Sequence, residues 1–293
     1  MATTTPARVI GSVTFQRSSG PALLLPLTGF SFEVEAVVAT GGSGGAGAAR
    51  PVLKPFMVAV VPDGGVAGLA SVANYTAAST PTFTTVTVSL ANPDGGTPVP
   101  FATLTNAAGT SLDVVPRSTP TEPQRVLLAL SPQVVSFSAG ATTVTYDAAL
   151  NTTPARCPVG SAASGDWVQA VAASQPPALP GVRDLVVRQF ELSGAWNTVP
   201  SGGGAAMSST FSGTVHATLP VGAPSLICLF GDVTTGQRYQ TFRARTLGPT
   251  GTPDLTISST LGFVSRFSLA TPNGVPTAEV SMDLGNHQLG DLP

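Results

Sequence analysis

The feature of this 293-residue sequence that most constrains its fold is an approximate internal repeat. In each half, an alternating strand-like segment is followed by a glycine-rich loop, another strand, a short helix and a further strand. The motif Phe32-Glu33-Val34 has a counterpart in Phe190-Glu191-Leu192, and Gly42 and Gly203 are separated by nearly the same interval. Agreement over several consecutive elements indicates duplication of one structural unit. The sequence therefore predicts two domains built on one plan, as its length also favours.

The clearest part of the repeat is a helix, a turn and a strand over residues 223–245. Pro224 to Phe230 is a short apolar run, Ser225 suits the start of a helix and Gly231 suits its end. The strand that follows should place Tyr239, Thr241 and Arg243 on one face and Gln240, Phe242 and Ala244 on the other. The counterpart in the first half is a helix over residues 68–75, followed by a strand over residues 83–90.

The number of short alternating segments separated by turns predicts a mainly β protein made of barrel or sandwich modules. We expect a first domain over residues 1–150, a linker rich in Pro, Ala and Ser over 151–181, and a second domain over 182–293. The dipeptide Asn273-Gly274 lies between alternating runs and predicts a tight hairpin turn.

Composition limits the function classes. Only 10% of residues are charged, the net charge is −2, and Lys54 is the single lysine. Nucleic-acid binding through basic patches is therefore not expected. No run is long enough for a membrane helix, and the N-terminus lacks the pattern of a secretory signal, so we expect synthesis in the cytoplasm and export, if any, by another route. So neutral a surface is typical of chains covered by other subunits, although an Ala/Thr/Gly-biased proteome would give the same composition.

No arrangement of reactive residues predicts an enzyme, a metal site or a cofactor site. His216 and His287 have no third ligand at metal spacing. A triad of His216, a serine and Asp232 lacks a nucleophile elbow, so His216 is expected to be a partly buried or surface residue. Gly202, Gly203 and Gly204 lack the lysine of a phosphate-binding loop.

Two acidic residues and two cysteines have more ordinary interpretations. Glu33 and Glu35 share the outer face of one strand, where we expect them to be solvated or paired with arginines across a subunit contact. Cys157 and Cys228 allow one disulfide, but buried free thiols are the favoured interpretation.

Three stretches together resemble a known family. The glycine-rich loop GGSGGAGAARPVLKPF, the proline-led helix APSLICLFG and the basic-ended strand YQTFRAR are similar to the haemolysin-coregulated protein (Hcp) family, the inner-tube proteins of bacterial type VI secretion, close in fold to phage tail-tube proteins. The resemblance implies two tandem Hcp-like β-barrels, each with one short α-helix. Family members typically carry one such domain and form six-membered rings that stack into a tube.

The resemblance implies a structural, self-assembling subunit without catalysis. Three chains would close a pseudo-hexameric ring, or six chains would form two stacked, fused rings; sheath, baseplate or cargo proteins are further expected partners. The type of system, whether secretion apparatus, phage-like tail or free filament, stays open. Two glycine loops would be stacking contacts between rings, or alternatively plain surface loops: Gly41, Gly42, Gly44, Gly45, Gly47 and Arg50 in the first, and Gly202, Gly203 and Gly204 in the second.

The alternative from another class is a secreted or surface binding module whose loops recognise a cell-surface or carbohydrate ligand. A surface cluster of Trp and Tyr would favour it, yet the chain has only Trp167, Trp196 and three tyrosines.

Overall fold

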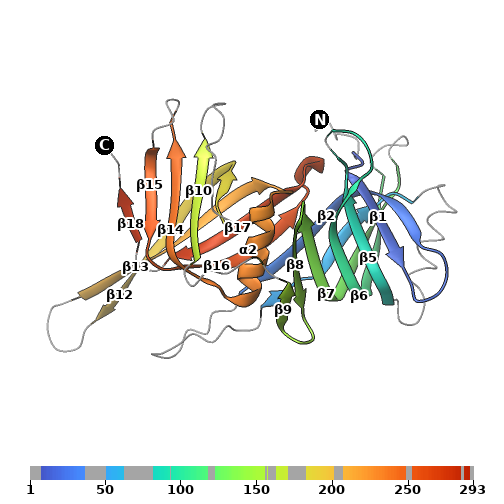
Figure 1. Ribbon diagram of the computed structural model, residues 1–293, viewed down its shortest axis with the longest axis horizontal. Helices are drawn as coiled ribbons and strands as arrows, with labels where there is room; N and C mark the ends of the chain where they lie inside the picture. Colours follow the sequence, from blue (N-terminus) through green and yellow to red (C-terminus); the bar gives the residue numbers. More distant parts are fainter. Residues whose placement is uncertain are drawn as a thin grey trace.

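The computed structural model describes residues 8–36, 51–62, 82–92, 94–117, 123–155, 157, 163–170, 183–200, 207–248, 253–284 and 287–290. These residues form β-strands, one α-helix and one 3-10 turn, arranged as two barrels side by side along the long axis with the helix between them (Figure 1). The mainly β fold with two barrels, predicted from the sequence, is confirmed.

The first barrel is a closed ring of six antiparallel strands. They are β1 (Gly11–Gln16), β2 (Leu23–Glu35), β4 (Phe56–Val60), β5 (Thr82–Leu90), β6 (Val99–Val115) and β7 (Arg125–Ala139). The pairing runs β1-β2-β4-β7-β6-β5 and returns to β1. Strand β3 (Val52–Leu53) pairs with β2, while β8 (Thr142–Asp147) and β9 (Thr152–Ala155) extend the sheet from β7. Closure removes free edges from most of the barrel wall.

The second barrel repeats this pairing. Its strands are β10 (Ala163–Ala170), β11 (Leu185–Val187), β12 (Gln189–Pro200), β13 (Met207–Pro220), β14 (Arg238–Leu247), β16 (Gly262–Ala270) and β17 (Thr277–Leu284). Strands β11 and β12 act as one strand interrupted at Arg188, and the ring runs β10-β11/β12-β13-β17-β16-β14 and back to β10. Strands β15 (Pro253–Ser259) and β18 (His287–Gly290) extend the sheet from β14.

Every neighbour relationship in the first ring has an equivalent in the second, so the sequence repeat is a repeat of topology. The exception is direction: β1 is antiparallel to both of its neighbours, whereas β10 is parallel to both of its own. Strand β10 lies in the range predicted as a linker. Nearby prolines and small residues obscure its pattern, yet Trp167 and Val168 are fully buried, so this segment forms part of the barrel wall.

Helix α2 (Pro224–Thr235) connects β13 to β14. It begins after Ala223 with Pro224 in its first turn and ends at Gly236, which has a φ of 64°. The predicted end at Gly231 is wrong, because the left-handed residue that closes the helix is Gly236. Gly231 lies inside the helix, where a Cβ atom would be 3.1 Å from Val144 of β8. Its role is close packing. The counterpart helix expected over residues 68–75 lies outside the described residues.

Strand β14 departs from the predicted alternation. Tyr239 and Phe242 are both buried, although they were expected on opposite faces. The pairing of β10 with β14 passes from Tyr239 to Thr241 and leaves Gln240 unpaired. A bulge of this kind shifts the side-chain phase by one residue, so two aromatic rings enter the core.

The predicted turn at Asn273-Gly274 is confirmed. It lies in the 3-10 turn η1 (Pro272–Gly274) between β16 and β17, where Asn273 and Gly274 have φ values of 52° and 73°. Asparagine and glycine are the residues that adopt positive φ at least cost.

Candidate assembly interface

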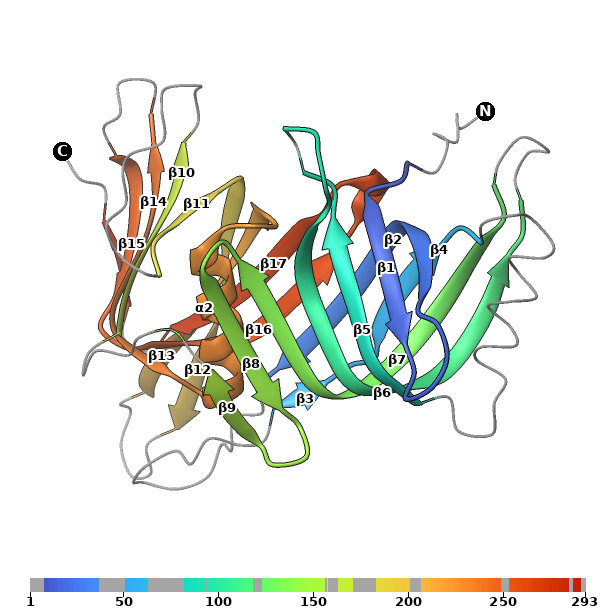
Figure 2. The ribbon, with the colours of Figure 1, turned by 45° about the vertical axis from the view of Figure 1, so that its right-hand side comes forward.

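The two barrels join through strand pairing, which we call the seam. Strand β2 continues past the first barrel, and its residues 32–35 pair antiparallel with residues 266–269 of β16. The seam makes one continuous sheet of two barrel walls, with β16 and β2 adjacent (Figure 2). The backbone N–H of Ala36 continues it by donating to the carbonyl of Ser265 at 2.8 Å.

Aromatic residues from both barrels pack behind the seam. Phe32 of β2 and Phe137 of β7 contact Phe230 of α2, with ring centroids 6.1 Å and 4.8 Å apart, and Phe230 contacts Phe267 of β16 at 5.6 Å. All four rings are buried. Burial of such a ring contributes on the order of 1.5–3 kcal/mol. Because the rings come from both barrels, the two barrels share a core.

Charged residues line the solvent side of the seam. Arg266 donates to Glu33 at 2.8 Å, and Lys54 also donates to Glu33. Burial raises the pKa of Glu33, but the hydrogen bonds from Arg266 and Lys54 outweigh it and lower this pKa to about 2. Glu33 was expected to be solvated or to meet an arginine across a subunit contact. Its arginine comes from the other barrel of the same chain.

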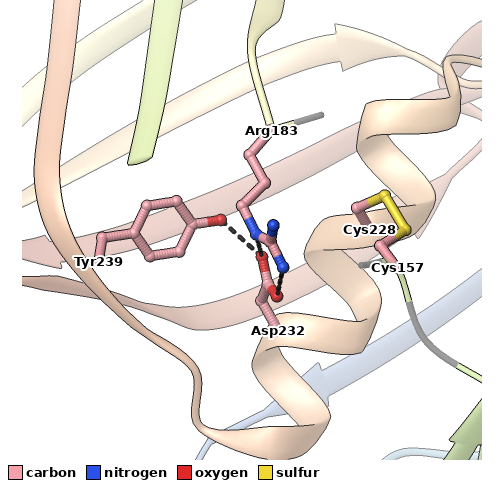
Figure 3. The surroundings of a disulfide bond; sticks show 5 residues. All are labelled: Cys157, Arg183, Cys228, Asp232 and Tyr239. Carbon is pink, nitrogen blue, oxygen red and sulfur yellow. Dashed lines mark hydrogen bonds and ion pairs between the residues drawn. A yellow bond between two sulfur atoms is a disulfide. The ribbon is translucent and has the colours of Figure 1, made fainter. Parts of the chain in front are cut away.

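Helix α2 is fixed to the second barrel by a buried ion pair (Figure 3). Arg183 donates to both carboxylate oxygens of Asp232, at 2.7 Å and 2.8 Å, and the hydroxyl of Tyr239 donates to the same carboxylate at 2.6 Å. Burial raises the pKa of Tyr239 well above its usual value, and the Asp232 charge raises it further. The hydrogen bond to Asp232 likewise raises the pKa of Arg183.

A disulfide between Cys157 and Cys228 ties the helix to the segment after β9 (Figure 3). The expectation of two free thiols is therefore wrong. The Cα atoms lie 5.4 Å apart although the cysteines are 71 positions apart in sequence, and this proximity is a tertiary property that spacing alone could not show.

His216 does not form the triad considered from the sequence. Its Nδ1 lies 2.9 Å from the Ser281 hydroxyl, and its Nε2 lies 3.0 Å from the Ser193 hydroxyl. Asp232 is instead held by Arg183 and Tyr239. Both ring nitrogens of His216 thus contact hydroxyls on the outer face of the second barrel, so the role of His216 is structural.

Among the described residues there is no group of three or more His, Cys, Asp or Glu that could hold a metal ion. The part of the chain that the structure describes also has no helix long and apolar enough to cross a membrane.

The predicted stacking residues cannot be placed. Gly41, Gly42, Gly44, Gly45, Gly47 and Arg50, together with Gly202, Gly203 and Gly204, lie outside the described residues, and their role stays a prediction. The seam residues Arg266 and Lys54 were missed by sequence reasoning. The signal was the Glu33 and Glu35 pair, but nothing in the sequence identified its partners.

No family model matches the sequence, and no curated protein matches it. The chain is similar to solved structures that include an Hcp protein. A type six secretion system protein is 10% identical with a TM-score of 0.40, and the match covers 50% of this chain and 99% of that one. Hcp1 from Salmonella typhimurium is 11% identical with a TM-score of 0.36, covering 49% and 99%.

A third similar structure is one chain of the anti-feeding prophage baseplate. It is 16% identical with a TM-score of 0.32, and the match covers 44% of this chain and 93% of that chain. Each of the three matches thus spans about half of this chain and nearly all of the other protein.

Proposed function

We propose that this chain is a structural subunit that assembles with copies of itself into rings, each barrel taking one place in the ring. Rings would stack into a hollow tube, as in the inner tube of type VI secretion or of a phage-tail-like injection system. The observation that carries the proposal is the seam. Two barrels with the same order of paired strands are joined by backbone pairing and a shared core, as neighbours in a ring would be.

The seam is a heterologous contact, because it uses β2 of one barrel and β16 of the other. These are not equivalent strands: β2 corresponds to β11/β12, and β16 corresponds to β6. A head-to-tail contact between similar units generates a closed ring or an open filament when it is repeated. A chain that carries one such contact internally needs a second one, between chains, to continue the series.

The proposal includes three chains per ring, giving six barrels in a pseudo-hexamer. The seam supports this arrangement because it places the two barrels of one chain in one continuous sheet. Six chains forming two fused, stacked rings is the competing arrangement. In the proposed tube, the glycine loops around Gly42 and Gly203 would form the contacts between rings. Sheath, baseplate or cargo proteins would be the further partners. Delivery to the assembly would depend on that machinery.

Negative-stain electron microscopy of the purified full-length protein tests the proposal. Rings or tubes with six lobes, in which two different lobe shapes alternate around the ring, would support it. Isolated particles of two lobes at all concentrations would overturn it, and would favour a binding module instead.

A further inference from the structure

We infer that consecutive chains join by pairing residues 111–114 of β6 in one copy with residues 192–195 of β12 in the next, antiparallel and in the register of the seam. The inference rests on the proposed function and names the surface that performs it. Each barrel contains a strand that occupies the same place as the seam strand of the other barrel.

Strand β6 occupies the place of β16. Strand β5 begins opposite Ala108 of β6, and β14 begins opposite Phe263 of β16. Ala108 therefore corresponds to Phe263. Three to six positions further along each strand, residues 111–114 of β6 correspond to residues 266–269 of β16. The latter are the β16 half of the seam.

Strand β12 occupies the place of β2. In β2 the pairing with β4 passes from Leu27 to Gly29 and skips Thr28, and the same strand in the second barrel is interrupted at Arg188. Aligning these irregularities makes residues 192–195 of β12 correspond to residues 32–35, the β2 half of the seam. This alignment matches the buried Phe30 with the buried Phe190. The sequence alignment of Phe32 with Phe190 is therefore wrong by two residues.

Both corresponding edges are open in the part of the chain that the structure describes. Residues 111–115 of β6 pair with β7 only, and β12 pairs with β13 only. Side-chain exposure shows the difference: Leu269 in the seam is 1% exposed, whereas its equivalent Val114 is 48% exposed. Proteins usually protect an open edge with charged residues, proline or a covering element. Neither segment contains lysine or proline, and Asp113 is the single charged residue of the two. A second copy of this chain would cover both.

The seam also shows which opposed residues exchange backbone hydrogen bonds and which do not. Ala36 bonds to Ser265 across it, whereas the carbonyl of Glu33 accepts from Lys54 on the opposite side of β2. Glu33 and Ser268 therefore face each other as a non-hydrogen-bonded pair, in which Cβ atoms lie about 4.5–5.5 Å apart. The equivalent pair between chains is Ser193 with Asp113, and Leu112 and Val114 direct their backbone groups toward the open edge.

Cysteine cross-linking tests this register. Both native cysteines form the Cys157–Cys228 disulfide, so a D113C/S193C variant carries the only free thiols. We expect mild oxidation to convert most of it into covalent oligomers up to three chains. The matched control is D113C/Q189C, because Gln189 is exposed on the same strand but lies about 13 Å from the required position. The control should cross-link at least tenfold less.

Val114→Pro gives a second measurement. The backbone N–H of Val114 points away from β7, so proline at this position should leave the hydrogen bonds between β6 and β7 intact while removing a donor from the open edge. We expect a melting temperature within a few degrees of wild type and self-association weakened at least tenfold, with Val114→Thr as the control that keeps the N–H. If wild type assembles and D113C/S193C cross-links no better than D113C/Q189C, the inferred edges are overturned. If wild type itself stays monomeric, the proposed function fails with them.

Discussion

Arg266 of the second barrel donates a hydrogen bond of 2.8 Å to Glu33 of the first, diagonally across the strands of the seam. The contact joins residues more than two hundred positions apart. It lies on the solvent side of a sheet whose other face packs the shared aromatic core, so polar and apolar contacts hold the same two strands together.

Replacing Glu33 with Gln should weaken the fold in a pH-dependent manner. The pKa of Glu33 is about 2 in the folded chain and about 4.3 when unfolded. The stabilisation is therefore fully present above about pH 4.3 and is lost as the pH falls toward 2. Because Arg266 and Lys54 are partly exposed, we expect a loss of about 1 kcal/mol at neutral pH. Urea unfolding from neutral to acidic pH should show the difference from wild type vanish near pH 2.

The control for that measurement is Glu191→Gln, an exposed carboxylate on β12. Its unfolding free energy should stay within about 0.5 kcal/mol of wild type. A Glu33→Gln variant whose stability follows wild type at every pH would contradict the role assigned to the ion pair.

Breaking the buried ion pair on α2 should cost far more. Asp232→Leu leaves the guanidinium of Arg183 buried without its carboxylate, and loss of one partner of such a pair typically costs about 3–5 kcal/mol. The double variant R183M/D232L removes both charges and should be less destabilised than Asp232→Leu alone. Chemical denaturation of Asp232→Leu, Arg183→Met and the double variant measures this, and a double variant whose cost equals the sum of the two single costs would show that the charges are not coupled.

The disulfide should contribute strongly to stability. Joining residues 71 positions apart restricts the unfolded chain by about 4 kcal/mol in the loop-entropy account. We expect C157S/C228S to melt at a clearly lower temperature than wild type, and added reductant to lower the wild-type value toward that of the variant. Reductant should leave the variant unchanged. Equal melting temperatures for wild type and variant would contradict this prediction.

Gly231 should tolerate little increase in size. A Cβ at this position lies 3.1 Å from Val144, so Gly231→Leu should destabilise the protein by roughly 1–3 kcal/mol through overpacking between α2 and β8. Adding Val144→Ala should recover part of that loss. Gly231→Ala is the informative small change, because the better helix propensity of alanine, about 1 kcal/mol, offsets the contact. Thermal unfolding of the three variants decides whether the helix packs this closely.

Much of the fold could be predicted because local pattern determines it. Alternation identified strands such as β2, proline and glycine bracketed the region of α2, and Asn273-Gly274 specified its turn. The predictions failed where tertiary contacts override local signals. Gly231 was interpreted as a helix end, but it is a packing residue. Gln240 forms a bulge in the pairing of β14 with β10, and no local pattern marked it.

The interface could be predicted only in part for the same reason. Glu33 was expected to be solvated or paired with an arginine of another subunit, but its partners Lys54 and Arg266 come from separate segments that only the folded chain brings together. The Cys157–Cys228 bond is likewise a product of the tertiary fold. The correspondence of β6 with β16 required the pairing order of both barrels, because the two strands share no recognisable motif.

The measurement that tests the central claim most directly is the native mass of the purified wild-type protein over a wide concentration range. Assembly of tandem barrels into one ring predicts a stable species of three times the chain mass of 29.3 kDa, which dissociates when β6 or β12 edge residues are altered. A species of one chain mass at every concentration would contradict it.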